Sequence, residues 1–559
     1  MTKKMSRVLA AALAGTMVFG SVPAIAGAEE AAGMDAWEAF DETVTLKIPV
    51  YDRGAEGVPD VTDNYWTQWV QSEFGDKYNI NVEYVGITRT DVMTDYALLG
   101  ASGELPTILM EYDYDKLATW ATEGYLTEYD IEQFAEIAPT YYQGMVDRDQ
   151  LQYVEIAGGD YLVLSERPYY ETNYTYITFV RMDWLEEVGY DYIPDMDSQD
   201  YIDAMLAIKE AGLAEYPDGV NNVMLTGVGS DQTYAFRAFP QDEENWVMYG
   251  DYQIPSLGSD ENYALLSFIN QKYNAGILDP EYYTIDTETQ KSNFINGQTF
   301  SYGGYISASM DWLTSFYEQN PDAELAVLVQ STELNEEGYA PAYRANNPFG
   351  MMIGFSSQAT EDEITAAMMY MEWMCQDDVL ETFQWGIEGE NFTYDEDGNK
   401  VSIDYSEQSS DYKQGYNNSI DYWCIVTASR STGTIEETIT ASLPQDLPQN
   451  FNDAVIENYY NQVEVASYGW AVTDCMFGDS LESVTEYQET LVNLYIELRD
   501  KLVVASEDEF DSLYEEYAQR YLDAGYQEVI DERLELYNEG MTTKLPTYEN
   551  AVATTFEAE

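Results

Sequence analysis

The segment from Thr43 to Asp113 alternates between short apolar runs and amphipathic runs, and this alternation restricts the fold more than any other feature. The pattern predicts strands at Thr43–Val50, Ile80–Ile87 and Thr107–Met110, separated by helices at Asp63–Phe74 and Thr90–Leu99. The order strand, helix, strand, helix, strand is typical of a right-handed parallel α/β unit. We therefore expect an α/β fold.

Polar and aromatic side chains follow two of these predicted strands. Tyr51 and Arg53 come directly after the first strand, and Glu111 and Tyr112 come directly after the third. Open α/β sheets bind ligands in the crevice outside the carboxyl ends of their strands. These four residues are therefore candidates for ligand binding. Arg53 has an alternative role, because an arginine in an acidic protein often forms a structural ion pair, here with Asp52 or Glu111.

The charge of the chain excludes one large class of partner. Its 559 residues contain 24 Lys and Arg against 103 Asp and Glu, a formal net charge of −79. Such a chain repels phosphate backbones and anionic lipid surfaces, so we expect no nucleic-acid partner. The apolar content of 45% is too high for a wholly disordered chain, and the length suffices for two or three domains.

The absence of histidine and the scarcity of cysteine narrow the chemistry further. Without histidine the chain has no Ser-His-Asp or Cys-His nucleophile system and no HExxH zinc site. Cys375, Cys424 and Cys475 are widely separated, allow at most one disulfide, and are expected to be buried structural residues. We predict no catalytic residues, no cofactor and no metal. A hairpin around Asp397-Gly398 resembles a calcium loop, but EF-hand spacing fails over residues 393–404.

The first residues have the three-part pattern of a secretory signal peptide. Lys3, Lys4 and Arg7 precede an apolar run over Val8–Phe19, which small residues follow. We expect residues 1–26 to be removed and residues 27–42 to form an acidic linker. The processing site has no cysteine, so simple secretion is favoured over a lipid anchor at the extracellular face of the membrane.

Several blocks of sequence, in this order, resemble those of extracellular solute-binding proteins. The blocks are Lys47–Gly54, Asp63–Thr67, Tyr78–Val82, Gly103–Ile108, Asn173–Gly189, Phe294–Tyr305 and Phe383–Asn391. More narrowly, the chain looks like the carbohydrate-type, LipO-like group of Gram-positive bacteria. The resemblance implies a two-lobed, class II periplasmic-binding-protein-like fold in which each lobe is a mainly parallel sheet flanked by helices, with a helical C-terminal region.

The same resemblance divides the mature chain between the lobes. We expect residues 43–164 and 347–420 to form lobe one, and residues 165–346 and 421–559 to form lobe two with the C-terminal helices. The chain would cross between lobes near Leu164–Val180 and Arg344–Gly350.

The resemblance also implies the function and extends the set of site residues. A receptor of this family captures a carbohydrate, here expected to be an oligosaccharide, by hinge closure of its two lobes over the ligand. It then delivers the carbohydrate to the membrane subunits of an ABC importer. We expect a monomer. Asp231, Tyr234 and Tyr305 match segments that face the ligand in the family. Trp66 and Trp385 could stack on a sugar or pack a helix against the sheet, and the sequence leaves both roles open.

Two alternative functions remain open at this point. An extracellular glycoside hydrolase needs only two carboxylates and no histidine, and 103 acidic residues make such a pair uninformative. A peptide-binding receptor would use backbone-type pairing and would not depend on stacked aromatic rings.

Overall fold

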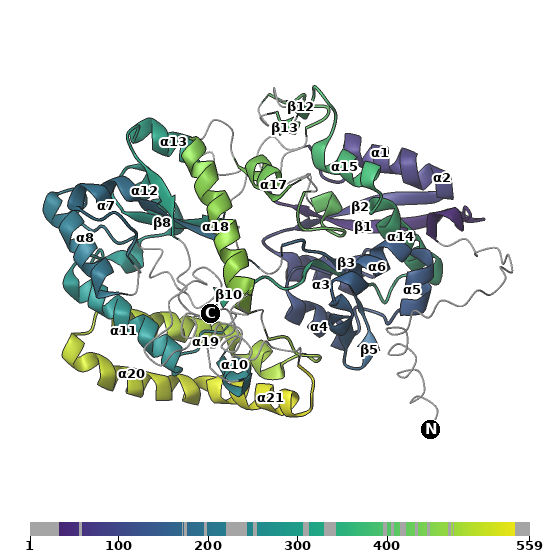
Figure 1. The fold of residues 1–559 in the computed structure, drawn as a ribbon. Coiled ribbons are helices and arrows are strands. Elements are labelled where there is room, and N and C mark those ends of the chain that lie inside the picture. The colour runs from purple at the N-terminus through teal and green to yellow at the C-terminus, as the bar shows by residue number, and fades with distance from the viewer. Residues whose placement is uncertain are drawn as a thin grey trace, which may run out of the picture.

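The computed structural model describes residues 33–54, 59–169, 172, 176–194, 198–219, 243–249, 254–305, 312–328, 343–394, 398, 400–403, 407–413, 421–430, 434–443, 448–467, 471–472 and 475–542. In this part of the chain two α/β lobes lie side by side, and long C-terminal helices run beneath them (Figure 1). The predicted signal peptide and residues 27–32 of the predicted linker lie outside the described residues. Residues 33–42 of that linker are described, and Met34, Trp37 and Phe40 pack against the core of lobe one.

The opening α/β unit of lobe one is confirmed. Strands β1 (Val44–Asp52) and β2 (Ile80–Thr88) pair in parallel along their full lengths. Strand β3 (Ile108–Glu111) runs beside β1 in the same direction, and just before it the backbone N–H of Thr107 donates to the carbonyl of Lys47 at 2.9 Å. The connecting helical segments are α1 (Tyr65–Val70), η3 (Gln71–Gly75), α2 (Asp76–Tyr78) and α3 (Val92–Ser102).

A capping box fixes the start of the first helix. The Asn64 side chain accepts hydrogen bonds from the backbone N–H groups of Trp66 and Thr67, while the Thr67 hydroxyl accepts one from the N–H of Asn64. These bonds satisfy N–H groups that a helix end otherwise leaves unpaired. The cap therefore fixes the start of the helix at Tyr65, and residues 53–64 separate it from the end of β1.

The rest of lobe one comes from two separate stretches of chain. The first contributes α4 (Tyr114–Thr122), α5 (Ile131–Ile137), α6 (Pro139–Asp147), η4 (Gln150–Tyr153), β4 (Glu155–Ile156), β5 (Gly159–Asp160) and β6 (Leu162–Glu166). The second contributes β11 (Phe349–Phe355), α14 (Glu361–Met374), α15 (Asp377–Trp385), β12 (Phe392–Tyr394) and β13 (Lys400–Ser402). Every residue of β11 is buried, because it enters the sheet between β3 and β6.

Lobe two is also assembled from separate stretches. Its elements are β7 (Tyr176–Arg181), α7 (Met182–Val188), α8 (Gln199–Ala211), α10 (Glu243–Tyr249), α11 (Asp260–Ala275), η6 (Tyr282–Thr284), α12 (Thr287–Ile295), β8 (Ser301–Tyr305), α13 (Trp312–Gln319), β9 (Leu325–Val327), β10 (Tyr343–Arg344), α17 (Ile435–Ser442), α18 (Gln449–Ser467) and β14 (Ala471–Val472). The predicted change from strand to helix within Asn173–Gly189 is confirmed by β7 and α7. Gly189 ends α7 at φ 96°, a conformation that glycine adopts without strain.

The sheets were expected to be mainly parallel, but the central strand of each three-stranded sheet pairs antiparallel with both of its neighbours. In lobe one β1, β2, β3 and β6 share a direction, but β11 runs antiparallel to both β3 and β6. In lobe two β7 runs antiparallel to both β8 and β9. The reason lies in the crossings, because β7 and β11 each enter a sheet from the other lobe and so run opposite to their neighbours.

Separate hydrophobic cores support the division into lobes. One cluster fills lobe one, and two smaller clusters lie on β7 and its helices in lobe two. The lobe-one cluster includes Tyr422, Trp423, Cys424, Ile425 and Val426, so its packing continues past the expected segment end at residue 420.

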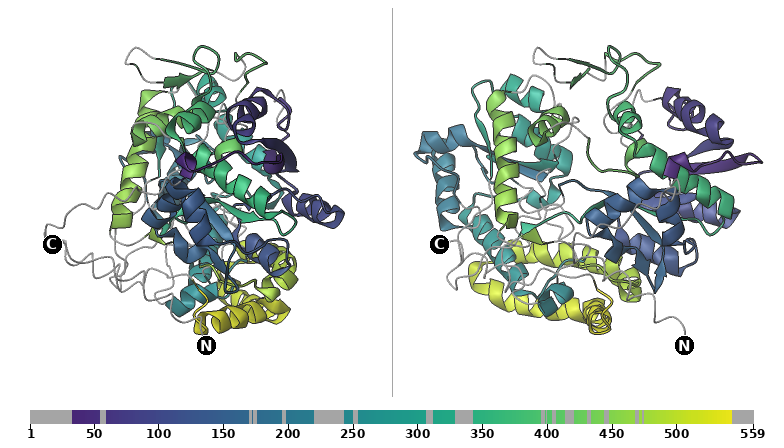
Figure 2. Two further views of the ribbon diagram at one scale, coloured as in Figure 1. Left: turned by 90° about the vertical axis from the view of Figure 1, so that its right-hand side faces the viewer. Right: turned by 45° about the vertical axis from the view of Figure 1, so that its right-hand side comes forward.

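A fourth core joins the C-terminal helices to α10 and α11. These helices are α19 (Glu482–Val503), α20 (Glu507–Tyr521), η7 (Leu522–Tyr526) and α21 (Gln527–Asn538), and they lie along the bottom of the views in Figure 2. Gly525 lies inside η7 at φ 123° and kinks a helix that continues beyond it. The backbone N–H of Ala157 in lobe one donates to the carbonyl of Gly478 at 2.7 Å, so this layer also contacts lobe one.

Candidate functional site

The carboxyl ends of the lobe-one strands meet at the edge where the chain crosses to lobe two. Asp52 ends β1, Thr88 ends β2, Glu111 ends β3 and Glu166 ends β6. Glu166 pairs with Phe349 at the point where β11 enters from lobe two. This edge is therefore both the ligand-binding edge that the fold class predicts and the edge nearest the crossings.

Arg53 forms a bidentate ion pair at this edge. Its Nε and Nη2 lie 2.7 and 2.9 Å from the two carboxylate oxygens of Asp421. The Asp421 side chain is fully buried, whereas 29% of the Arg53 side chain is exposed. Burial raises the pKa of the Asp421 carboxyl above its ordinary value, and the Arg53 guanidinium opposes that rise. The structural ion pair considered for Arg53 is thus present, with Asp421 as its partner in place of Asp52 or Glu111.

Two of the predicted tyrosines, Tyr51 and Tyr112, have their rings near the guanidinium of Arg89, a residue that the sequence analysis did not select. The Arg89 guanidinium carbon lies 5.0 Å from the ring centre of Tyr51 and 5.9 Å from that of Tyr112. Tyr51 is only 1% exposed, and its hydroxyl donates to the carbonyl of Met110. Tyr112 keeps part of its surface exposed, although burial raises the pKa of its hydroxyl. Of these two residues, Tyr112 is the one that keeps exposed surface at this edge.

Glu111 is used within the protein. The residue is 1% exposed, and its Oε1 accepts the backbone N–H of Tyr112 at 2.7 Å. Its Oε2 lies 3.9 Å from Nζ of Lys116, a distance that leaves a weak ion pair. This arrangement fixes the backbone direction at Tyr112, so Glu111 acts on the edge by positioning its neighbour.

Both predicted tryptophans are buried in aromatic packing. Trp66 is 3% exposed and packs edge-on against Tyr65, with the ring of Phe383 also nearby. Trp385 is 5% exposed, packs against Phe392, and has the Arg430 guanidinium over its ring. The observed contacts favour the packing role for both residues over stacking on a sugar.

The predicted residues of lobe two are described less fully. Asp231 and Tyr234 lie outside the described residues. Tyr305 ends β8, and its backbone pairs with Tyr176 at the start of β7. Since β7 begins directly after a crossing from lobe one, this register puts Tyr305 at the edge of the lobe-two sheet nearest that crossing.

Sequence reasoning missed Arg89 and Asp421 for different reasons. Arg89 follows β2 by one residue, so the rule that selected Arg53 and Tyr112 would also have selected it. Asp421 is 368 residues from Arg53, and no local pattern marks it among so many acidic residues.

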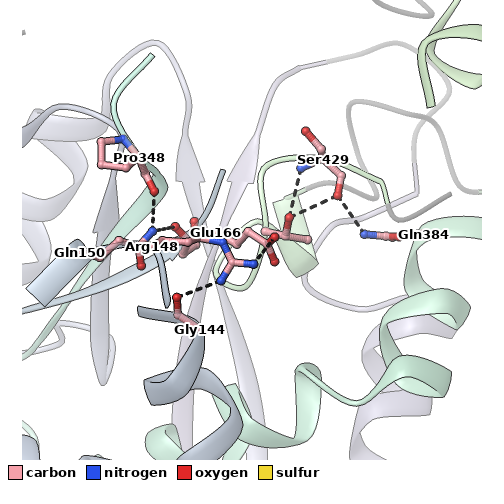
Figure 3. Close-up of polar contacts among 9 residues, drawn as sticks. Gly144, Arg148, Gln150, Glu166, Pro348, Gln384 and Ser429 are labelled. Atoms are coloured by element: carbon pink, nitrogen blue, oxygen red, sulfur yellow. Dashed lines mark hydrogen bonds and ion pairs between the residues drawn. The ribbon is translucent and has the colours of Figure 1, made fainter. Parts of the chain in front are cut away.

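Three crossing segments lie side by side between the lobes. The backbone N–H of Glu166 donates to the carbonyl of Val426, and that of Ala428 donates to the carbonyl of Glu166, both at 2.7 Å. The buried Gln150 amide donates to the carbonyls of Ser165 and Pro348, which lie on different segments (Figure 3). The segments of the predicted crossings near residues 164–180 and 344–350 are therefore joined by a third segment, residues 426–430, that we did not expect.

Further contacts tie the crossings to lobe one. Arg148 of lobe one forms an ion pair with Glu166, and the Gln384 amide donates to the carbonyl of Ser429 (Figure 3). At Gly350 an added Cβ would lie 2.8 Å from both the Ala428 Cβ and the Ser165 Oγ. That separation is too short for side-chain contact, so the segments approach this closely only with glycine at that position.

The described residues show how the chain stands with respect to metal sites, disulfides and membrane-spanning helices. In the described part of the chain no three His, Cys, Asp or Glu side chains gather closely enough to hold a metal ion. Residues 395–397, 399 and 404–406 of the hairpin region lie outside that part. Cys375, Cys424 and Cys475 form no disulfide, and Cys424 is buried. Among the helices that the structure describes, none has the length and apolar character needed to cross a bilayer.

Known structures share this fold at low sequence identity. A solute-binding protein from Bifidobacterium longum infantis, described as "HMO binding" and associated with an ABC transporter, aligns with a TM-score of 0.59 and 14% identity, covering 89% of this chain and 99% of its own. The Streptococcus pneumoniae substrate-binding protein FusA, with fructo-nystose, gives 0.55 and 14%, with the same coverage. The alginate-binding protein AlgQ2 gives 0.56 and 14%, covering 90% and 99%. These neighbours confirm the two-lobed periplasmic-binding-protein-like fold.

Sequence comparison gives the family itself. Comparison with curated protein sequences gives no significant match. The family model for bacterial extracellular solute-binding proteins matches residues 69–387, which is more than half of the chain and spans both lobes. The LipO-like group stays a prediction. On this evidence, the chain belongs to the family of bacterial extracellular solute-binding proteins.

Proposed function

We propose that this protein is a secreted, non-catalytic receptor that captures an oligosaccharide between its lobes and delivers it to the membrane subunits of an ABC importer. The observation that carries the proposal is the position of Tyr112, a partly exposed residue at the strand ends of lobe one. Aromatic faces of this kind stack on the apolar faces of sugars. The structural neighbours include an alginate-binding protein and the substrate-binding protein FusA in complex with fructo-nystose or kestose, which supports a saccharide as the ligand.

The mechanism that we propose is closure of the lobes about the three crossing segments. Ligand contacts made only in the closed form shift the equilibrium toward it. Tyr305 lies on the second sheet at the edge nearest a crossing, which supports its assignment to the opposing side of the site. Asp231 and Tyr234 remain proposed ligand-binding residues of the same lobe. We propose that the protein works as a monomer.

An oligosaccharide panel tests the proposal and separates it from its rivals. Binding is measured by the change in tryptophan fluorescence, and the sugars are then analysed for cleavage. Binding without cleavage is the expected result, and a bound sugar should raise the melting temperature. Release of shorter products would identify a glycoside hydrolase, whereas binding of peptides but no sugar would identify a peptide receptor.

The Tyr112→Ala variant tests the position of the site. Removing the ring should weaken sugar binding by about 1–2 kcal/mol, because it removes one stacking surface. Tyr161→Ala is the matched control, since Tyr161 is also partly buried against the lobe-one core but precedes β6 at the opposite edge of the sheet. Equal affinity in both variants, together with an unchanged affinity in Tyr305→Ala, would show that the sugar binds elsewhere.

A further inference from the structure

Arg89 differs from most arginines in the described part of the chain. Seven others each donate a hydrogen bond to a polar group of another residue: Arg53, Arg148, Arg181, Arg430, Arg499, Arg520 and Arg533. The Arg89 guanidinium has ring contacts but no hydrogen bond or ion pair to any described residue. With 103 acidic residues against 24 basic ones, a guanidinium without a carboxylate partner requires an explanation.

The carboxylates around Arg89 already have other partners. Asp421 binds Arg53 through both of its oxygens. Asp52 accepts the backbone N–H of Gly54 at 2.8 Å, and Asp95 accepts that of Thr88 at 2.7 Å. The edge therefore presents a cation beside Asp421, whose two oxygens are already bound to Arg53.

Contacts of its backbone and of its side chain fix the position of Arg89. Its backbone N–H donates to the carbonyl of Asp52 at 2.9 Å, which ties the end of β2 to the end of β1. Its guanidinium lies near the rings of Tyr51 and Tyr112, and the Tyr51 hydroxyl is held by the carbonyl of Met110. A half-buried guanidinium held in this way loses little conformational freedom when it binds a ligand.

We infer that Arg89 recognises a carboxylate on the ligand, so that the ligand class is an acidic oligosaccharide containing uronic acid. This inference rests on the proposed function and adds the chemical class of sugar. The planar guanidinium has the geometry to bind a carboxylate through two hydrogen bonds. Tyr112 beside it offers a ring face to the same or the adjoining sugar residue.

The test uses a panel of galacturonate, mannuronate and glucuronate oligosaccharides, each paired with its carboxyl-reduced, neutral counterpart. Calorimetry on the mature chain measures both members of every pair. At least one uronate should bind about tenfold or more tightly than its neutral counterpart. Arg89→Gln should remove that preference while leaving the melting temperature of the free protein nearly unchanged.

Arg520→Gln is the matched control, because it removes the same positive charge from an exposed position on α20. That variant should keep the preference for the uronate. Neutral counterparts that bind as tightly as the uronates, or a preference that survives in Arg89→Gln, would overturn the inference and leave the sugar receptor standing. Binding of no saccharide at all would overturn the proposed function, and the inference with it.

Discussion

The Gln150 amide gives the sharpest prediction about the crossings. Gln150 is 1% exposed, and its Nε2 donates to the carbonyls of Ser165 at 3.1 Å and Pro348 at 2.5 Å. Gln150→Leu keeps a side chain of similar size but removes both bonds. Each buried hydrogen bond contributes about 1–1.5 kcal/mol net, so the variant should lose about 2–3 kcal/mol of unfolding free energy.

The assay is urea unfolding followed by tryptophan fluorescence. Gln152→Leu is the matched control, because Gln152 lies in the same short helix but is exposed and bonds only to Asp149. That control should lose less than about 0.5 kcal/mol, as exposed substitutions usually do. Equal unfolding free energies for the two variants would refute the reasoning that Gln150 holds two crossing segments together.

Two further predictions concern charge. Arg53→Leu should cost about 3–5 kcal/mol at pH 7, because it leaves the buried Asp421 carboxylate uncompensated. Burial raises the pKa of Asp421, so the folded variant binds a proton more readily than the unfolded chain. The loss of unfolding free energy should therefore shrink as pH falls to about 4. An equal loss in urea unfolding at both pH values would contradict this. The melting temperature of the native chain should also rise when salt increases from about 10 to 300 mM, since salt screens the self-repulsion of a net charge of −79. Scanning calorimetry that showed no rise would mean that this repulsion does not limit stability.

Local patterns in the sequence were sufficient to predict the first α/β unit. Apolar runs and end signals set β1, β2 and their helices, and the Ser198 cap and the Gly276 stop set α8 and α11 in the same way. These signals act within a few residues, so a single sequence displays them.

Contacts between distant parts of the chain could not be predicted from these signals. The placement of β11 between β3 and β6, and the pairing of Arg53 with Asp421, depend on residues hundreds of positions apart. The same limit applies to Trp66 at a helix start, because its environment depends on Phe383 from the other stretch of lobe one. Composition also gave no sign that Arg89 would form no ion pair with the described carboxylates.

The three crossings have a consequence for how the chain folds. The core of lobe one includes both Leu46, in the first strand of that lobe, and Trp423, more than three hundred positions later. A ribosome that has released only the first half of the polypeptide has therefore produced neither lobe in full. Bringing such remote segments together has a high entropic cost and slows the search for the native state. The nascent chain thus remains unassembled until most of its length has been synthesised, and a lobe cannot be excised as a contiguous fragment.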